Sequence, residues 1–311
     1  MKRCVKQKAT MMILLAAFCA DMALWGCAAE EKKTDEPINA QTTSTLYEQF
    51  LNGEIPATVS SDYFVDGYAE DILEKNSALT LKELEACVSN YYFDPEDTDK
   101  SFGGHIQYAY MTCPDSPEKS EKSLLVKFLG LDIYSEGDDS YTVFILSEAN
   151  GQLSISGLYE CWDRSITSAY ANGILSGGGS GGADCHAADL SVILSDGQRI
   201  PIYDAVFYSG RSAGEIDRPL YNEIFDDQAE PALTVSIYTI GNEKYYQYDM
   251  TYCGEAEIPL CEDYINRCRE ESAVYWSSDK EIETAVQKQC TAVGVDYALI
   301  SQREEVVWND L

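Results

Sequence analysis

The residues best suited to chemistry in this sequence lie in the segment 176–186, SGGGSGGADCH. Backbone N–H groups of a glycine-rich loop can hold an anion, and Cys185 beside His186 suggests a thiol nucleophile with its base. However, neighbouring residues of an extended chain point to opposite sides, so adjacency does not place the imidazole on the thiol. Nearby carboxylates also disfavour the thiolate. We therefore expect a flexible loop at 177–182, with ligand contact and catalysis as alternatives.

The remaining metal or base candidates are few. His105 is the only other histidine, and we expect it to be structural, at the start of a strand. The acidic run 94–101 superficially resembles an EF-hand loop. Counted from Asp97, however, positions 6 and 12 hold Phe102 and Tyr108, where that loop needs glycine and glutamate. We expect a solvated loop, with a looser calcium site as the alternative, and we assign no metal-binding residue.

An alternating aromatic segment lies at 245–252. Tyr246, Tyr248, Met250 and Tyr252 would share one face of a strand. Such a face could bind sugar rings, but a half-buried core face with tyrosine hydroxyls at its edge is the favoured interpretation. Carboxylates are abundant, yet no spacing singles out an acid/base pair for glycoside cleavage. The sequence therefore predicts no catalytic and no cofactor-binding residue.

The N-terminus predicts export and lipid attachment. Residues 2–8 are basic and 11–20 are apolar, a run too short to span a bilayer but typical of a signal peptide. The segment 23–27, ALWGC, is similar to a lipobox. We expect residues 1–26 to be removed and Cys27 to carry lipid, which anchors the protein to the outer face of the cell membrane. Secretion without lipid is the alternative.

The rest of the chain divides into a stalk and one domain. Residues 27–44 have almost no large apolar side chains and predict a flexible polar stalk. Residues 45–311 contain no second apolar run of membrane-spanning length and predict a single extracytoplasmic domain. The segment 209–231 is the only weak boundary within it.

The net charge of the chain argues against polyanionic partners. The formal net charge is -31, and the predicted leader is basic, so the mature chain is even more acidic. Such a surface is repelled by nucleic acid and by anionic lipid headgroups. The acidity favours solubility, with cation binding as the alternative.

Eleven cysteines are present. An even number remains after removal of the leader and lipidation of Cys27, which permits disulfides outside the cell but leaves their pairing open. If 259–270 is a helix, Cys261 and Cys268 lie too far apart to pair, and they share a buried face with Leu260, Tyr264 and Ile265. The mature cysteines are Cys87, Cys113, Cys161, Cys185, Cys253, Cys261, Cys268 and Cys290.

Helices are predicted at both ends of this domain. Helical spacing indicates one after Thr45 that stops at Asn52-Gly53, and a second over 63–75. Capping boxes at Thr80-x-x-Glu83 and Ser278-x-x-Glu281 begin two more, which end near residues 90 and 294. A further helix is expected at 259–270.

The centre of the chain predicts strands. Apolar, aromatic and β-branched runs are separated by Asn150-Gly151, Asp196-Gly197 and Gly241-Asn242, which favour hairpin turns. We therefore expect an α+β fold in which antiparallel hairpins are flanked by N-terminal and C-terminal helices. The predicted strands are 106–112, 124–133, 141–147, 153–162, 190–194, 200–208, 233–240 and 244–252.

Taken together with the lipobox, the segments LYEQFLNGEIPA (46–57), YAY (108–110), LDIY (131–134), YECWDRS (159–165) and SGGGSGGADCH (176–186) resemble a group of uncharacterised lipoproteins from Gram-positive anaerobes. The resemblance implies a lipid anchor and no defined activity. We expect a surface lipoprotein whose domain binds a small molecule, a wall or host glycan, or another envelope protein. An envelope hydrolase and a structural or assembly lipoprotein are the alternatives.

Overall fold

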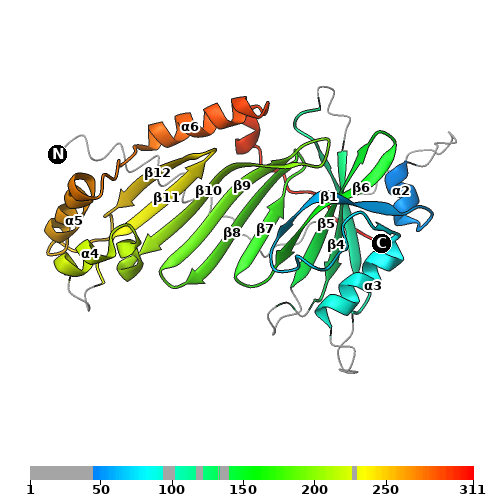
Figure 1. Ribbon diagram of the computed structural model, residues 1–311, viewed down its shortest axis with the longest axis horizontal. Coiled ribbons are helices and arrows are strands. Elements are labelled where there is room, and N and C mark those ends of the chain that lie inside the picture. Colours follow the sequence, from blue (N-terminus) through cyan, green and yellow to red (C-terminus); the bar gives the residue numbers. More distant parts are fainter. Residues whose placement is uncertain (1–44, 94–101, 117–121, 132, 134–139, 226–229) are drawn as a thin grey trace, which may run out of the picture.

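The computed structural model describes residues 45–93, 102–116, 122–131, 133, 140–225 and 230–311. They form a mixed α+β structure, mostly sheet, in which two sheets lie side by side along the long axis of the molecule (Figure 1). The coarse α+β prediction is confirmed. The leader, Cys27, the stalk and the acidic run 94–101 lie outside the described residues.

The first sheet has seven strands in the described part of the chain, in the order β13-β3-β4-β5-β6-β1-β2. All neighbours are antiparallel except β1 and β6, which run parallel. The strands are β1 (Ala57–Asp66), β2 (Ala78–Leu79), β3 (Ile106–Thr112), β4 (Lys122–Leu129), β5 (Tyr141–Ala149), β6 (Gln152–Cys161) and β13 (Asn309–Asp310).

The second sheet is an antiparallel meander of six strands, in the order β12-β11-β10-β9-β8-β7. Consecutive strands pair throughout, and the β9–β10 and β11–β12 pairs match the two hairpins predicted in this region. The strands are β7 (Ser165–Ala169), β8 (Ile174–Gly182), β9 (Cys185–Ile193), β10 (Arg199–Ser209), β11 (Thr234–Ile240) and β12 (Glu243–Asp249).

Helices cover the sheets and close separate cores (Figure 1). The first two helices pack on the seven-stranded sheet, α6 lies across the six-stranded sheet, and α4 and α5 pack together at its far end. The helices are α2 (Leu46–Leu51), α3 (Leu81–Tyr92), α4 (Arg218–Phe225), α5 (Ile258–Glu271) and α6 (Asp279–Ala292), with 3₁₀ turns η1 (Gly210–Glu215) and η2 (Tyr297–Ser301).

Local signals in the sequence are confirmed where they act over a few residues. Thr80 and Glu83 cap α3 reciprocally, and Ser278 and Glu281 do the same for α6. The Asn150-Gly151 turn between β5 and β6 has positive φ at both residues, 54° and 73°, as a type I′ turn requires. Each of these caps and turns is set by residues that lie within a few positions of one another in the chain.

Two predicted elements are wrong. The helix expected over 63–75 is absent, because residues 57–66 form β1, whose β-branched and aromatic residues pair with β6. The glycine loop expected at 177–182 is strand β8, paired on both sides by β7 and β9. Sheet hydrogen bonds need only backbone, so glycine does not prevent a central strand when its neighbours hold it in place.

The predicted flanking of the sheets by helices is only partly correct. β1 and β2 separate α2 from α3, and β13 follows the C-terminal helices. The segment 209–231, predicted as a weak boundary, contains η1 and α4 within its described residues, and α4 packs on α5. Cys261 and Cys268 are fully buried as expected, but Leu260 is exposed and does not share their face.

Close contacts join the two sheets. The β9–β10 turn packs its Gly197 on the first sheet, where an added Cβ would meet the Ser156 side chain at 2.5 Å. Beside it, the carboxylate of Asp115 accepts hydrogen bonds from the backbone and hydroxyl of Ser195, at 2.9 and 2.8 Å. These small and polar side chains allow the turn to approach the sheet closely.

The C-terminal segment 304–311 also spans both sheets. Ala171 donates its N–H to the carbonyl of Glu304 at 2.8 Å, and Val306 donates to Ala169 at 3.1 Å. The chain then pairs with β3 through β13, and Leu311 donates to Ile106 at 3.1 Å. The end of the chain thus ties the edge of the second sheet to the edge of the first.

Candidate functional site

An open groove lies where the end of β1, the β6–β7 turn and β8 meet. Its volume is about 440 Å³. Because these segments belong to both sheets, the groove exists only when the sheets are joined. The lining residues are Asp66, Gly67, Tyr68, Trp162, Arg164, Ser165, Gly179, Ser180, Gly181 and Ala187.

Two aromatic side chains line this groove. The ring centroids of Tyr68 and Trp162 are 5.5 Å apart, with an angle of 46° between the planes. The tyrosine is 61% exposed, so part of its ring is open to solvent in the groove. The pair therefore offers a surface with apolar faces and polar edges.

The carboxylate of Glu160 fixes the backbone at Tyr68. This carboxylate is buried at 2% exposure and accepts hydrogen bonds from the backbone N–H groups of Tyr68 and, at 3.2 Å, Ala69. The hydroxyl of Tyr92 donates to its other oxygen at 2.6 Å. A Cβ on Gly67 would lie 2.2 Å from Glu160 Oε2, so only glycine permits this approach.

Charged and hydroxyl groups surround the aromatic pair. Arg164 is exposed, while Asp66, Ser165 and Ser180 are half-buried. Gly179 and Gly181 also line the groove, and neither has a side chain that covers its own backbone. Hydroxyl, carboxylate and guanidinium groups beside aromatic rings can bond a ligand that carries many hydroxyls.

Beside the groove, a half-buried ion cluster fixes Asp66. Arg199 contacts Asp66 at 3.1 Å and Asp189 at 2.8 Å. Burial is the main cause that raises the pKa of Asp189, to about 6, although Arg199 opposes this shift. Asp189 lies over Gly177, where an added Cβ would be 1.9 Å from its Oδ1. One glycine of the segment 177–182 therefore makes room for a carboxylate.

Cys185 and His186, which the sequence offered as an alternative nucleophile and base, are not brought together. Both residues lie on β9 in successive positions, where Cys185 pairs with Tyr208 and His186 with Phe207. Successive side chains of a strand project to opposite faces, and no hydrogen bond joins these two side chains in the described structure. The imidazole of His186 is therefore not placed to act as a base for the Cys185 thiol.

The other sequence candidates have structural surroundings. His105 Nε2 lies 3.3 Å from Asp310 on β13, at the edge of the first sheet. Tyr246 and Met250 pack against the core under α5, as the core interpretation of that face predicts. Tyr252, however, lies beyond the end of β12 and is 79% exposed, so it does not continue the face.

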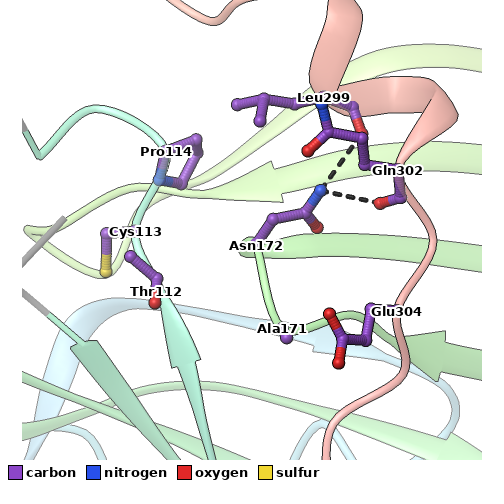
Figure 2. A pocket seen from close by; sticks show the side chains of 8 residues that line it. All are labelled: Thr112, Cys113, Pro114, Ala171, Asn172, Leu299, Gln302 and Glu304. Atoms are coloured by element: carbon purple, nitrogen blue, oxygen red, sulfur yellow. Dashed lines mark hydrogen bonds between the residues drawn. The ribbon is translucent and has the colours of Figure 1, made fainter.

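A second, smaller pocket of about 230 Å³ lies beside the C-terminal segment (Figure 2). Asn172, in the β7–β8 turn, donates from Nδ2 to the carbonyls of Leu299 and Gln302 at 3.1 and 2.8 Å. Figure 2 shows its amide oxygen directed away from both, and this buried atom has no hydrogen-bond partner. The pocket is lined by Thr112, Cys113, Pro114, Ala171, Asn172, Leu299, Gln302 and Glu304.

The sequence interpretation missed the groove residues. Tyr68 lay in a segment assigned to a helix, and Glu160, Trp162 and Arg164 were noted only within YECWDRS. A signal was available, because Glu160 is the one charged residue of the predicted strand 153–162. A buried acid needs several donors, and their source was a turn 92 positions earlier in the chain.

Within the described residues, no group of three or more His, Cys, Asp and Glu side chains is arranged to hold a metal ion. The same residues include no helix whose length and apolar character would suffice to cross a bilayer. Comparison of the chain with family models, curated proteins and solved structures finds no significant match.

Proposed function

We propose that this chain is a lipoprotein of the outer face of the cell membrane, anchored through Cys27, whose domain binds carbohydrate in the groove at Tyr68 and Trp162. The single observation that carries the proposal is this aromatic pair, with one ring 61% exposed and both rings in an open groove. The N-terminal leader and the ALWGC segment support the anchor.

Carbohydrate suits the chemistry of the groove. A sugar ring has apolar C–H faces, which pack on aromatic rings, and hydroxyl edges, which bond carboxylates, hydroxyls and guanidinium groups. Asp66, Arg164 and Ser165 supply such groups around the rings. The net charge of -31 disfavours polyanionic ligands, so a neutral wall or host glycan is the expected class.

The test measures binding to neutral oligosaccharides and wall fragments by the full-length protein in detergent. A glycan array selects the ligand, and calorimetry gives its Kd. Trp162→Ala and Tyr68→Ala should each weaken binding roughly tenfold or more. Tyr252→Ala removes a tyrosine outside the groove that is still more exposed, at 79%, and should leave the Kd unchanged.

Unchanged affinity in both groove variants would place the ligand elsewhere, and an array without any binder would refute the carbohydrate assignment. The anchor is tested separately by growing cells with radiolabelled palmitate. Label should enter the wild-type chain but not Cys27→Ala. Equal labelling of both would refute the attachment site without affecting the groove.

A further inference from the structure

Two thiols meet at the turn between β12 and α5. Cys253 lies four residues after the end of β12, and Cys261 is the fourth residue of α5. Their Sγ atoms are 3.6 Å apart. Cys261 is fully buried in the core formed with α4, and Cys253 packs against that core while remaining partly exposed.

Local hydrogen bonds keep the two cysteines close together. Gly254 accepts from the N–H groups of Glu257 and Ile258 at 2.9 and 3.1 Å, and Cys261 donates to the Glu257 carbonyl at 2.9 Å. The backbone N–H of Gly254 donates to the Glu257 carboxylate at 2.8 Å. The closed turn therefore brings the two cysteines together through short-range structure, and the contact does not depend on a mobile loop.

From this geometry we propose that Cys253 and Cys261 form a disulfide in the exported protein. A disulfide bond is about 2.05 Å long, so the sulfur atoms need to approach by roughly 1.5 Å, a shift on the scale of side-chain rotation. The proposal rests on the predicted export, because disulfides persist outside the cytoplasm. It is independent of the carbohydrate groove.

The oxidant required is a disulfide, either of a small thiol or of a dithiol oxidase. Cys253, the more accessible thiol, loses its proton and attacks the oxidant, which releases one thiol and leaves a mixed disulfide. Cys261, after losing its proton, attacks the Cys253 sulfur and displaces the second thiol. Two cysteine thiols are thereby oxidised and one oxidant disulfide is reduced to two thiols.

The surroundings disfavour other uses of these sulfurs. Burial is the main cause that raises the pKa of the Cys253 thiol, with Glu257 and Asp249 adding to the shift, and burial raises the pKa of Cys261 to about 12. Such thiols are weak nucleophiles at neutral pH because the thiolate is scarce. Oxidation in vitro should accordingly accelerate as the pH rises from 7 to 9.

The other cysteines supply matched controls. Cys161 accepts a hydrogen bond from the backbone of Thr167 at 3.2 Å, and Cys113 lies 3.5 Å from the Ser123 hydroxyl. Cys290, on α6, is fully buried in a different core. We expect these three to stay as thiols.

The experiment isolates the full-length protein from membranes under acid, alkylates free thiols and analyses unreduced peptides by mass spectrometry. The expected result is a peptide pair joined through Cys253 and Cys261, with the control cysteines alkylated. In Cys253→Ser, the Cys261 thiol should be alkylated after denaturation, whereas Cys290→Ser should keep the joined pair. Alkylation of both cysteines in wild type, even after incubation with oxidised glutathione at pH 8.5, would overturn the proposal, as would pairing with another cysteine.

Thermal unfolding gives a second measurement. Closing a loop of this length should make reductant lower Tm by roughly 5 °C in wild type and in Cys290→Ser. The double variant Cys253→Ala/Cys261→Val keeps the core filled, and its Tm should not respond to reductant. An equal response in the double variant would assign the effect to other cysteines and contradict the proposal.

Discussion

The guanidinium of Arg199, on β10, lies 3.1 Å from the carboxylate of Asp66, at the end of β1. This ion pair joins the two sheets beside the proposed carbohydrate groove. The same guanidinium contacts Asp189 at 2.8 Å, and its Nε donates to the Ser191 hydroxyl at 2.9 Å. A planar fork with several donors satisfies these groups together, which a lysine cannot do.

Replacing Arg199 should destabilise the protein. Arg199→Met keeps the aliphatic packing but leaves Asp189 buried without its cation, at an expected cost of about 3 kcal/mol. Chemical denaturation measures this cost. Arg267→Met is the matched control, since Arg267 pairs with the exposed Glu223 and Glu271 and should cost less than about 1 kcal/mol. Equal costs of the two substitutions would show that the ion cluster between the sheets stabilises the protein no more than an exposed ion pair does.

Stability should depend on pH through Asp189. Burial raises the pKa of its carboxyl from 3.8 to about 6, so between these values the native state binds more protons than the unfolded state. The contribution of this group is therefore fully present below about pH 4 and is lost as the pH rises through 6. Relative to Asp189→Asn, the wild type should gain about 2 kcal/mol between pH 7 and pH 4.

Unfolding curves of both proteins at several pH values measure that difference. Asp263→Asn is the control, because residue 263 is exposed on α5, and its difference from wild type should stay flat. A flat difference for Asp189→Asn would mean that this carboxyl is not protonated in the native state above pH 4.

Glycine should be required at position 177 for a steric reason. In Gly177→Ala, the new Cβ would lie 1.9 Å from the carboxylate of Asp189, and relief of the clash should cost roughly 2 kcal/mol. Gly181→Ala, on the same strand, places its Cβ in ordinary contact at 3.6 Å and should change the free energy of unfolding little. Equal stability of the two variants would contradict this account of the glycine-rich segment.

Glu160 should position the groove. Glu160→Ala removes the acceptor of the Tyr68 and Ala69 N–H groups, which should cost about 3 kcal/mol and weaken carbohydrate binding. Glu160→Gln keeps an acceptor and should be milder in both measurements. Glu148→Ala, an exposed position, serves as the control for titration calorimetry and denaturation. If Glu160→Ala binds ligand like wild type, the turn is not positioned by this carboxylate.

Asn172 should fasten the C-terminal segment. Asn172→Ala deletes both donated hydrogen bonds to Leu299 and Gln302, at an expected cost of about 2 kcal/mol. Asn172→Asp should cost more, because a carboxylate cannot donate and faces two carbonyl oxygens. Hydrogen exchange of the amides from 299 to 306 reports the loosening, and unchanged protection in both variants would disprove it. Asn266→Ala, on the exposed side of α5, is the control.

Elements whose determinants lie within a few residues could be predicted. The capping boxes at Thr80 and Ser278 satisfy the first N–H groups of their own helices, and Asn150-Gly151 tolerates the positive φ that its tight hairpin turn requires. The apolar runs predicted most of the central strands for the same reason. In the second sheet this holds for β9 to β12, which correspond to the two predicted hairpins, but not for β7 and β8.

Elements that depend on distant partners could not be predicted. The helix predicted over 63–75 overlaps the end of β1, which is held as a strand by parallel pairing with β6 and antiparallel pairing with β2. β8 consists largely of glycine, and only β7 and β9 hold it extended. In β8, sheet hydrogen bonds override the low strand propensity of glycine.

Local sequence therefore specifies the α+β class, most strand positions and the starts of α2, α3, α5 and α6, because side chains near in sequence set them, and it predicts the anchor at Cys27. The way in which the two sheets join, and hence the place of the groove, emerges only in the folded chain. Tyr68 meets Trp162, and Arg199 meets Asp66, across long stretches of chain. No local pattern encodes such contacts, since they arise when separate buried surfaces pack against each other.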